Sequence, residues 1–261
     1  MIGTFISSVQ SEWLKTKRSL TAPLVLGAAC FIPLVILVVR LMRSRQLPDI
    51  YRAPDFWQRL WISSWESMVL MILPFTIVLI VSLLTQIEYR NSTWKQLHAS
   101  PQPLATIFFA KLTVVLTLVL LLFVLFIAAM YVTAMVPVLL FASVDAPLGR
   151  IPVAHFLRRS GSFFIDVLPI VGLQYLLALR FRSFVVPIGI AVALWILALG
   201  SLAWQFNYLF PYGYATIDYT TEVQSRVNHQ LPASTRVLAM GCFAVFTLAG
   251  YILYVTKRDR G

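Results

Sequence analysis

Residues 112–144 read LTVVLTLVLLLFVLFIAAMYVTAMVPVLLFASV, and this run contains no charged side chain. A helix needs about 20 predominantly apolar residues to cross the hydrocarbon core of a bilayer. The run exceeds one crossing, and a proline inside a helix removes a backbone hydrogen bond. We therefore predict a membrane-spanning helix from Leu112 to about Val136 that ends at Pro137.

The apolar character extends over the whole chain of 261 residues, which is 59% apolar and 12% charged, with a mean hydropathy of +0.83. A soluble domain is about 45–50% apolar and about 25% charged. This composition excludes a soluble enzyme and a disordered chain. The formal net charge is +11, but the cationic residues stand singly between apolar runs. We expect anionic membrane lipids as their partners, and no nucleic acid.

Five further runs are apolar and long enough to be spans, which gives six transmembrane helices in a single domain over residues 1–261. They are Thr21–Val39, Ser67–Ile87 (with an earlier start at Trp61 as an alternative), Gly161–Leu179, Phe184–Trp204 and Val237–Thr256. Residues 1–18 are too polar to cross, and their apolar residues recur at helical spacing. We predict an all-α polytopic membrane protein whose residues 1–18 form an amphipathic helix in the membrane interface.

Six spans place both ends of the chain on one side of the membrane. Arginine and lysine together are nearly even across the membrane, so they do not fix the orientation. However, every lysine falls on the side of the ends, and most loop acids fall on the other side. We therefore predict cytoplasmic termini.

Two acids, Glu66 and Asp166, lie in or beside predicted spans. A charge in hydrocarbon is costly, so such a group pairs with a cation, lies at headgroup depth or faces a wet cavity. Pairing with Arg59 or Arg159 is the simpler interpretation, and a cavity for a cationic substrate is the functional one. Three tryptophans, Trp57, Trp61 and Trp65, lie one turn apart near Glu66 and predict either an interfacial aromatic belt or a substrate entrance.

A compact polar segment, EYRNSTWKQLHASP over residues 88–101, joins the second and third spans. Trp94 and Leu97 stand at helical spacing, so a short helix here has a small apolar face. Ser100 and Pro101 are typical of a helix start. Physical reasoning alone leaves an interfacial helix and a protein-docking helix equally open.

The sequence contains no G-x-x-x-x-G-K-[ST] loop, no H-E-x-x-H and no G-x-S-x-G motif. Its three histidines, His98, His155 and His229, lack the spacing of metal ligands. We therefore expect no catalytic residue, no metal site and no ATP site in this chain.

The pattern Glu88-x-Arg90-x-x-Thr93-Trp94-Lys95-x-Leu97-x-x-x-Pro101, followed by Lys111, resembles the segment between spans two and three of ABC-2 type permeases. The opening Glu12-x-Leu14-Lys15-x-Lys17-Arg18 resembles the same family. The similarity is greatest to the small permeases of bacteriocin and lantibiotic export or immunity systems.

The resemblance implies a permease subunit of an ABC exporter in the bacterial cytoplasmic (inner) membrane, paired with a second permease chain. Separate cytoplasmic ATPase subunits would bind ATP and magnesium, so this chain would carry no cofactor. Residues 88–101 would be the coupling helix, and the substrate would be a peptide such as a cationic antimicrobial peptide, a lipid or another amphipathic molecule. The residues implied in the ATPase contact are Glu88, Arg90, Thr93, Trp94, Lys95 and Leu97.

Two other classes of function remain as alternatives. An ATP-independent secondary carrier or channel predicts an internal repeat and paired broken helices, and the sequence shows neither. An immunity or sensor protein that sequesters a ligand needs no docking helix, so the Trp94 segment argues against it.

Overall fold

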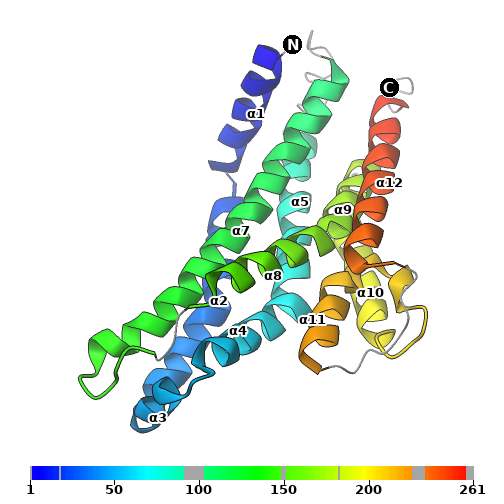
Figure 1. Cartoon of the computed structure of the whole chain (residues 1–261). Helices are drawn as coiled ribbons and strands as arrows, with labels where there is room; N and C mark the ends of the chain where they lie inside the picture. Colours follow the sequence, from blue (N-terminus) through cyan, green and yellow to red (C-terminus); the bar gives the residue numbers. More distant parts are fainter. Residues whose placement is uncertain are drawn as a thin grey trace.

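The computed structural model describes residues 2–17, 19–90, 103–147, 151–181, 183–224 and 233–256, and every regular element in these ranges is helical (Figure 1). The helices are α1 (Ile2–Lys17), α2 (Thr21–Met42), α3 (Leu47–Arg52), α4 (Phe56–Ser67), α5 (Leu73–Arg90), α7 (Leu104–Leu140), α8 (Val153–Asp166), α9 (Leu168–Arg180), α10 (Val185–Gly200), α11 (Tyr214–Gln224) and α12 (Thr235–Thr256). Short 3-10 turns, η1 (Ser44–Gln46), η3 (Asn207–Leu209) and η4 (Pro211–Gly213), and a π-helical turn, η2 (Met68–Ile72), connect them.

The predicted all-α membrane fold is confirmed. Within the described ranges, five helical stretches are long and apolar enough to cross a membrane: Thr21–Met42, Phe56–Gln86, Leu104–Leu140, Val153–Arg180 and Thr235–Thr256. The sixth predicted span, Phe184–Trp204, appears as α10, a shorter apolar helix of 16 residues. Turns replace the helix after Gly200, where the sequence becomes rich in aromatic and polar residues.

The prediction that Pro137 ends the third span is wrong, because α7 continues to Leu140. Pro137 leaves the carbonyl of Thr133 without its helical donor, and the helix continues for only three residues beyond it. The neighbouring carbonyl of Ala134 accepts a hydrogen bond of 2.8 Å from the hydroxyl of Tyr51, which belongs to α3. This contact fixes α3 against the last turns of α7.

The second span begins earlier than Ser67, as the alternative start suggested, and runs continuously from Phe56 through α4, η2 and α5. Pro74 has no N–H, so the carbonyl of Leu70 lacks its α-helical donor. The indole Nε1 of Trp195, on α10, donates a hydrogen bond of 2.9 Å to that carbonyl. A π-helical turn and a proline therefore share one place in the helix, and α10 docks on it.

We expect Trp195→Phe to destabilise this contact by about 1 kcal/mol, because the ring packing on Phe75 is kept while the Leu70 carbonyl loses its donor. Thermal unfolding of the purified protein in mild detergent would measure the loss. Trp204→Phe is the matched control, since Trp204 is exposed. Equal unfolding temperatures for the two variants would contradict this account of the bulge.

The fourth span is broken into α8 and α9 at Val167, and Pro169 opens α9. Helix α9 packs closely on α12 through small residues, since a Cβ on Gly172 would lie 3.1 Å from the ring of Phe243. Small residues let membrane helices approach in this way. The break places the fully buried Asp166 at the joint between α8 and α9.

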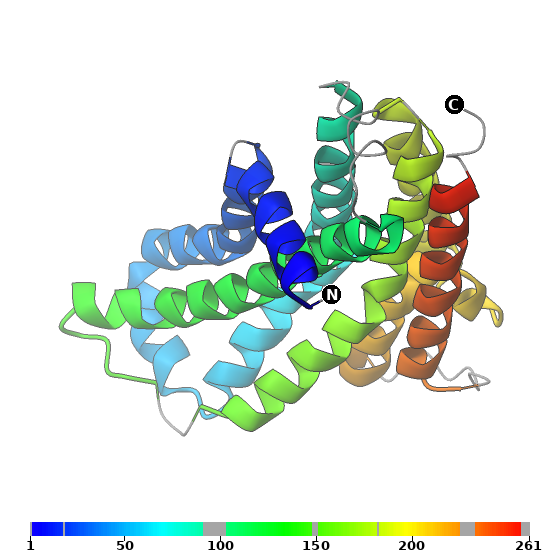
Figure 2. The ribbon, with the colours of Figure 1, turned by 90° about the horizontal axis from the view of Figure 1, so that it is seen from above.

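The two ends of the described chain lie at the same end of the bundle, together with the end of α5 and the beginning of α7 (Figure 1). Seen from that end, α1 crosses over α7, against which it packs (Figure 2). Helices α3, α4 and α11 lie toward the opposite end (Figure 1). This arrangement agrees with the predicted placement of both termini on one side.

Candidate functional site

The predicted coupling segment lies between α5 and α7. Glu88 and Arg90 belong to the last turn of α5, whereas Thr93, Trp94, Lys95 and Leu97 lie outside the described residues. The end of α5 and the beginning of α7 lie at the end of the bundle that carries the termini (Figure 1).

Charged residues of the two sequence motifs meet where α1 packs on α7. Glu12 of α1 forms an ion pair with Lys15, and its second carboxylate oxygen lies 3.9 Å from the Nζ of Lys111 on α7. Glu12 and Lys111 are only 5% and 3% exposed. The face of α1 that packs on the bundle includes Ser8, Glu12 and Thr16, so its buried stripe is polar. Opposite charges allow α1 to pack against α7 in this way.

The three tryptophans of α4 do not form a belt at the membrane surface. Trp57, Trp61 and Trp65 are buried, with Trp61 stacked on Phe156 and Phe163 of α8 and Trp65 packed on Phe126 of α7. A spacing of four residues puts all three rings on one face of α4, and that face turns inward. Their indole N–H groups have no hydrogen-bond partner among the described residues. A buried donor without an acceptor costs about 1–3 kcal/mol, so these three N–H groups are unsatisfied polar atoms among the packed helices.

Asp166 lies beside Asp218 of α11 and beside Thr235 and Arg236 at the start of α12. Asp166 is fully buried, and neither of its carboxylate oxygens makes a well-formed hydrogen bond within the described residues. Two carboxyl groups in such proximity repel each other when both are ionised. The joint between α8 and α9 thus holds an under-compensated acidic pair.

One form of the simpler interpretation, pairing of Glu66 or Asp166 with Arg59 or Arg159, is not seen among the described residues, because both arginines pair elsewhere. The other form, a position at headgroup depth, stays a prediction. Arg59 pairs with Asp55 at 2.6 Å, and Arg159 pairs with Glu222 of α11 at 2.5 Å. Glu66 is exposed.

The acids of α11 are only partly compensated by these cations. Burial raises the pKa of Asp218, and the charges of Arg159 and Arg236 oppose that rise. Burial likewise raises the pKa of Glu222, against the charges of Arg159 and His155, whose Nε2 lies 3.8 Å from the carboxylate. We call Asp166, Asp218 and Glu222 the acidic cluster.

Helix α11 also ties the acidic cluster to the tryptophans. The hydroxyl of Tyr219 donates a hydrogen bond of 3.1 Å to the carbonyl of Ile62 in α4, and its ring stacks on Trp61. Burial raises the pKa of Tyr219 to about 12, and the charge of Glu66 contributes to the rise. Four of the five residues predicted to line a substrate path, Trp61, Trp65, Glu66 and Asp166, therefore surround the contact of α4, α8 and α11. The fifth, Trp57, stacks instead on Tyr131 of α7.

Sequence reasoning missed α11 and hence Asp218 and Glu222, which it treated as loop acids. The signal was present in their spacing of four residues, which puts both carboxylates on one face of a helix. The many aromatic residues at positions 204–214 are typical of a membrane interface, and they favoured a loop over a helix in this part of the sequence.

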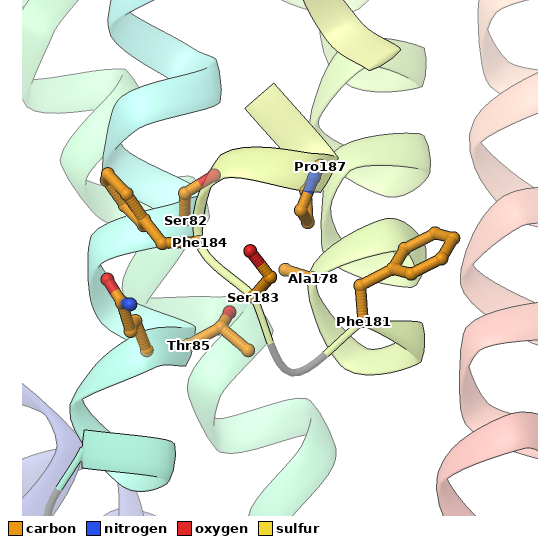
Figure 3. A pocket seen from close by; sticks show the side chains of 8 residues that line it. Ser82, Thr85, Ala178, Phe181, Ser183, Phe184 and Pro187 are labelled. Atoms are coloured by element: carbon orange, nitrogen blue, oxygen red, sulfur yellow. The ribbon is translucent and has the colours of Figure 1, made fainter. Parts of the chain in front are cut away.

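A second buried polar group lies nearer the end that carries the termini. The amide of Gln174 on α9 donates a hydrogen bond of 2.8 Å to Ser82 of α5, and Tyr212 lies 3.4 Å from the Gln174 carbonyl oxygen. Ser82 also lines a small pocket of about 10 Å³, together with Thr85 and with Phe181 and Phe184 of the following turn (Figure 3). That volume holds at most one water molecule. These polar contacts fasten α5, α9 and η4 together.

No group of three or more histidine, cysteine, aspartate or glutamate side chains in the described part of the chain could hold a metal ion. The fold and these buried charges define a multi-pass helical membrane protein with polar side chains inside its bundle. A sequence profile of the ABC-2 family transporter proteins matches residues 8–198, and the chain belongs to this family.

The protein is therefore a transmembrane component of an ABC transporter, not itself an ATPase, and components of this family work with ATPase partners. The matched region includes Glu12, Lys111 and Asp166 but ends before α11. No curated protein matches the chain.

Proposed function

We propose that this chain is the permease of an exporter that moves a cationic amphipathic molecule outward, with an antimicrobial peptide of the bacteriocin or lantibiotic class as the leading candidate. Separate ATPase subunits, which bind ATP and magnesium, supply the energy, and a second permease chain completes the membrane part. The acidic cluster is the observation that supports a cationic substrate. Its buried carboxylates are not all paired with cations of the protein, so a positively charged ligand is favoured there. The three tryptophans of α4 support an amphipathic ligand. They offer apolar ring surface together with indole N–H groups that have no hydrogen-bond partner among the described residues.

The ATPase contact in this proposal is residues 88–101. Trp94 and Leu97 enter an apolar groove on the ATPase, and Glu88, Arg90, Thr93 and Lys95 surround them with polar contacts. A buried aromatic anchor contributes more to binding than charges on the rim. The connection of this segment to both α5 and α7 supports this role, because a force on the segment is passed directly to two helices.

The proposed location is the bacterial cytoplasmic membrane with both termini in the cytoplasm. Helix α1 and the beginning of α7, which carry Lys15 and Lys111, lie at the end of the bundle that carries the termini, and α11, which carries Asp218 and Glu222, lies toward the other end. Lysine near the cytoplasmic surface is the usual distribution. In this orientation the acidic cluster lies toward the outer side of the membrane, which is where an exported molecule leaves.

Trp94→Ala tests the proposal in cells. A host strain without this protein is complemented with the parent chain or with Trp94→Ala, and the inhibitory concentration of cationic amphipathic peptides is measured. We expect the parent chain to restore resistance and Trp94→Ala to lose most of it, because loss of a buried aromatic anchor costs at least about 2 kcal/mol of binding.

Trp204→Ala is the control, since it removes an exposed tryptophan distant from residues 88–101. It should restore resistance as the parent chain does, with equal amounts of each variant in the membrane. Full resistance with Trp94→Ala would contradict the docking role. A strain whose sensitivity to every cationic peptide tested is unchanged by loss of the chain would contradict the substrate class.

A further inference from the structure

An apolar groove of about 380 Å³ lies where α4, α7 and α8 meet, separate from the acidic cluster. Its walls include Trp57 of α4, Val124, Ala128 and Tyr131 of α7, and Phe156 and Leu157 of α8. Its size falls in the range of small-molecule sites, and almost all of its lining is hydrocarbon or aromatic. Figure 1 shows α8 and α4 both approaching the second half of α7, away from the end that carries the termini.

We infer that this groove binds an acyl chain of an anionic phospholipid, as a resident lipid of the protein. The first argument is where the groove opens. Val124, Tyr131 and Leu157 are each about half exposed while they line it, so the groove opens on the outer surface of the bundle. The exposed row of α7 continues with Leu120 and Leu121, which a membrane helix turns toward lipid. An occupant therefore enters from the hydrocarbon and must be apolar.

The second argument is the charge around the groove. Arg158 follows Leu157 on α8, is exposed, and makes no ion pair with any other residue that the structure describes. Arg52 and Arg59 flank Trp57 in the chain and pair with Asp145 and Asp55. Arg158 therefore leaves one positive charge without a described counterion, next in the chain to Leu157, which lines the groove. A phosphate group compensates such a charge, and arginine binds phosphate well.

The two features together select a phospholipid over other apolar molecules. The groove offers van der Waals contacts to an acyl chain that already lies in hydrocarbon, so it selects the chain by shape. Arg158 offers a cationic partner for the anionic headgroup. A neutral lipid satisfies only the first feature, so we expect selection for an anionic headgroup.

Ala128→Trp is designed to fill the groove, because Ala128 is exposed, lines the groove and leaves the core of α7 untouched. The full-length protein is reconstituted into phosphatidylcholine vesicles that contain a phosphatidylglycerol with a photoactivatable acyl chain. After irradiation, mass spectrometry locates the labelled peptides. We expect labelling concentrated on residues 124–131 and 153–157, and a several-fold loss of this labelling in Ala128→Trp, because the indole occupies the space of the acyl chain.

Leu120→Trp is the matched control, since Leu120 is exposed on the same helix and lies outside the groove. It should leave the labelling unchanged. Unlabelled phosphatidylglycerol should compete with the photoactivatable lipid for the groove about fivefold less well in Arg158→Gln than in the parent protein. Competition by phosphatidylcholine should be the same in both. The inference is overturned by labelling spread evenly along the exposed face of α7, by equal labelling of Ala128→Trp and Leu120→Trp, or by equal competition from the two lipids.

The experiment needs no ATPase and no transported substrate, so its result is independent of the proposed export. A labelled lipid that moves to the opposite leaflet only when ATP and an ATPase are present would make it cargo, and would overturn its role as a resident lipid.

Discussion

Replacing Glu12 by leucine is expected to release α1 from α7. Glu12 and Lys111 are buried at this contact, and removing one charge of a buried pair typically costs about 3–5 kcal/mol. We take about 3 kcal/mol, because Lys111 has other interactions in the structure. Backbone amides of α1 should then exchange with deuterium roughly a hundredfold faster, as measured by mass spectrometry on the protein in detergent.

The double variant Glu12→Leu with Lys111→Leu separates electrostatics from packing. Replacing both members of a buried pair by apolar residues is often neutral, so most of the protection of α1 should return. Lys17→Leu, at the exposed end of α1, is the control and should change little. A double variant that exchanges as fast as the single one would show that Lys111 does not oppose Glu12 as proposed.

Replacing Arg159 by methionine is expected to loosen α11 in a way that depends on pH. Arg159 is the nearest cation to Glu222, and its charge also acts on Asp218. Losing a charge-assisted hydrogen bond in a partly buried site costs about 2 kcal/mol at neutral pH. The thermal unfolding temperature of the purified variant at about pH 8 should therefore fall below that of the parent protein.

Acidification should reverse much of this loss. The pKa values of Asp218 and Glu222 are already raised by burial, and removal of Arg159 raises them further. A carboxyl whose folded pKa is raised stabilises the fold below its ordinary pKa, and this stabilisation is lost as the pH rises through the folded value. The gap between variant and parent should thus narrow from about pH 8 to about pH 5.

Two controls bracket the Arg159 prediction. Arg159→Lys keeps the charge and should retain most of the stability. Arg52→Met removes a cation from an exposed pair with Asp145 and should have little effect at either pH. A pH-independent loss in Arg159→Met would mean that the arginine acts through packing of its apolar stem, and not through the acidic cluster.

Much of the fold could be predicted because membrane spans are read from apolar length alone. Residues 112–144 and 237–256 have no competing interpretation as apolar runs, and helices cover 112–140 and 237–256. The errors arise where tertiary contacts override local signals. Pro137 lies inside a helix that Tyr51 supports from another element, and the fourth span breaks at Val167 beside a proline that simple hydropathy passes over.

The sequence could predict several residues of the candidate site, but not which of them contact one another. The sequence singled out Asp166 and the tryptophans by their positions, yet it could not show that Arg159 turns to Glu222 across the fold. It named Glu12 and Lys111 as parts of two motifs, and only the structure brings the two motifs together. Such pairings depend on contacts between residues distant in the chain, which periodicity does not encode.

The central claim is that this chain works as the membrane component of an ABC transporter with an ATPase bound at residues 88–101. The most direct test is purification of the tagged full chain from its host in mild detergent, with quantification of the bound proteins by mass spectrometry. We expect an ATPase subunit with a phosphate-binding loop in equal amount to the permease, and its loss from the Trp94→Ala variant but not from Trp204→Ala. A chain that purifies without any ATPase, even after crosslinking in intact cells, would contradict the account.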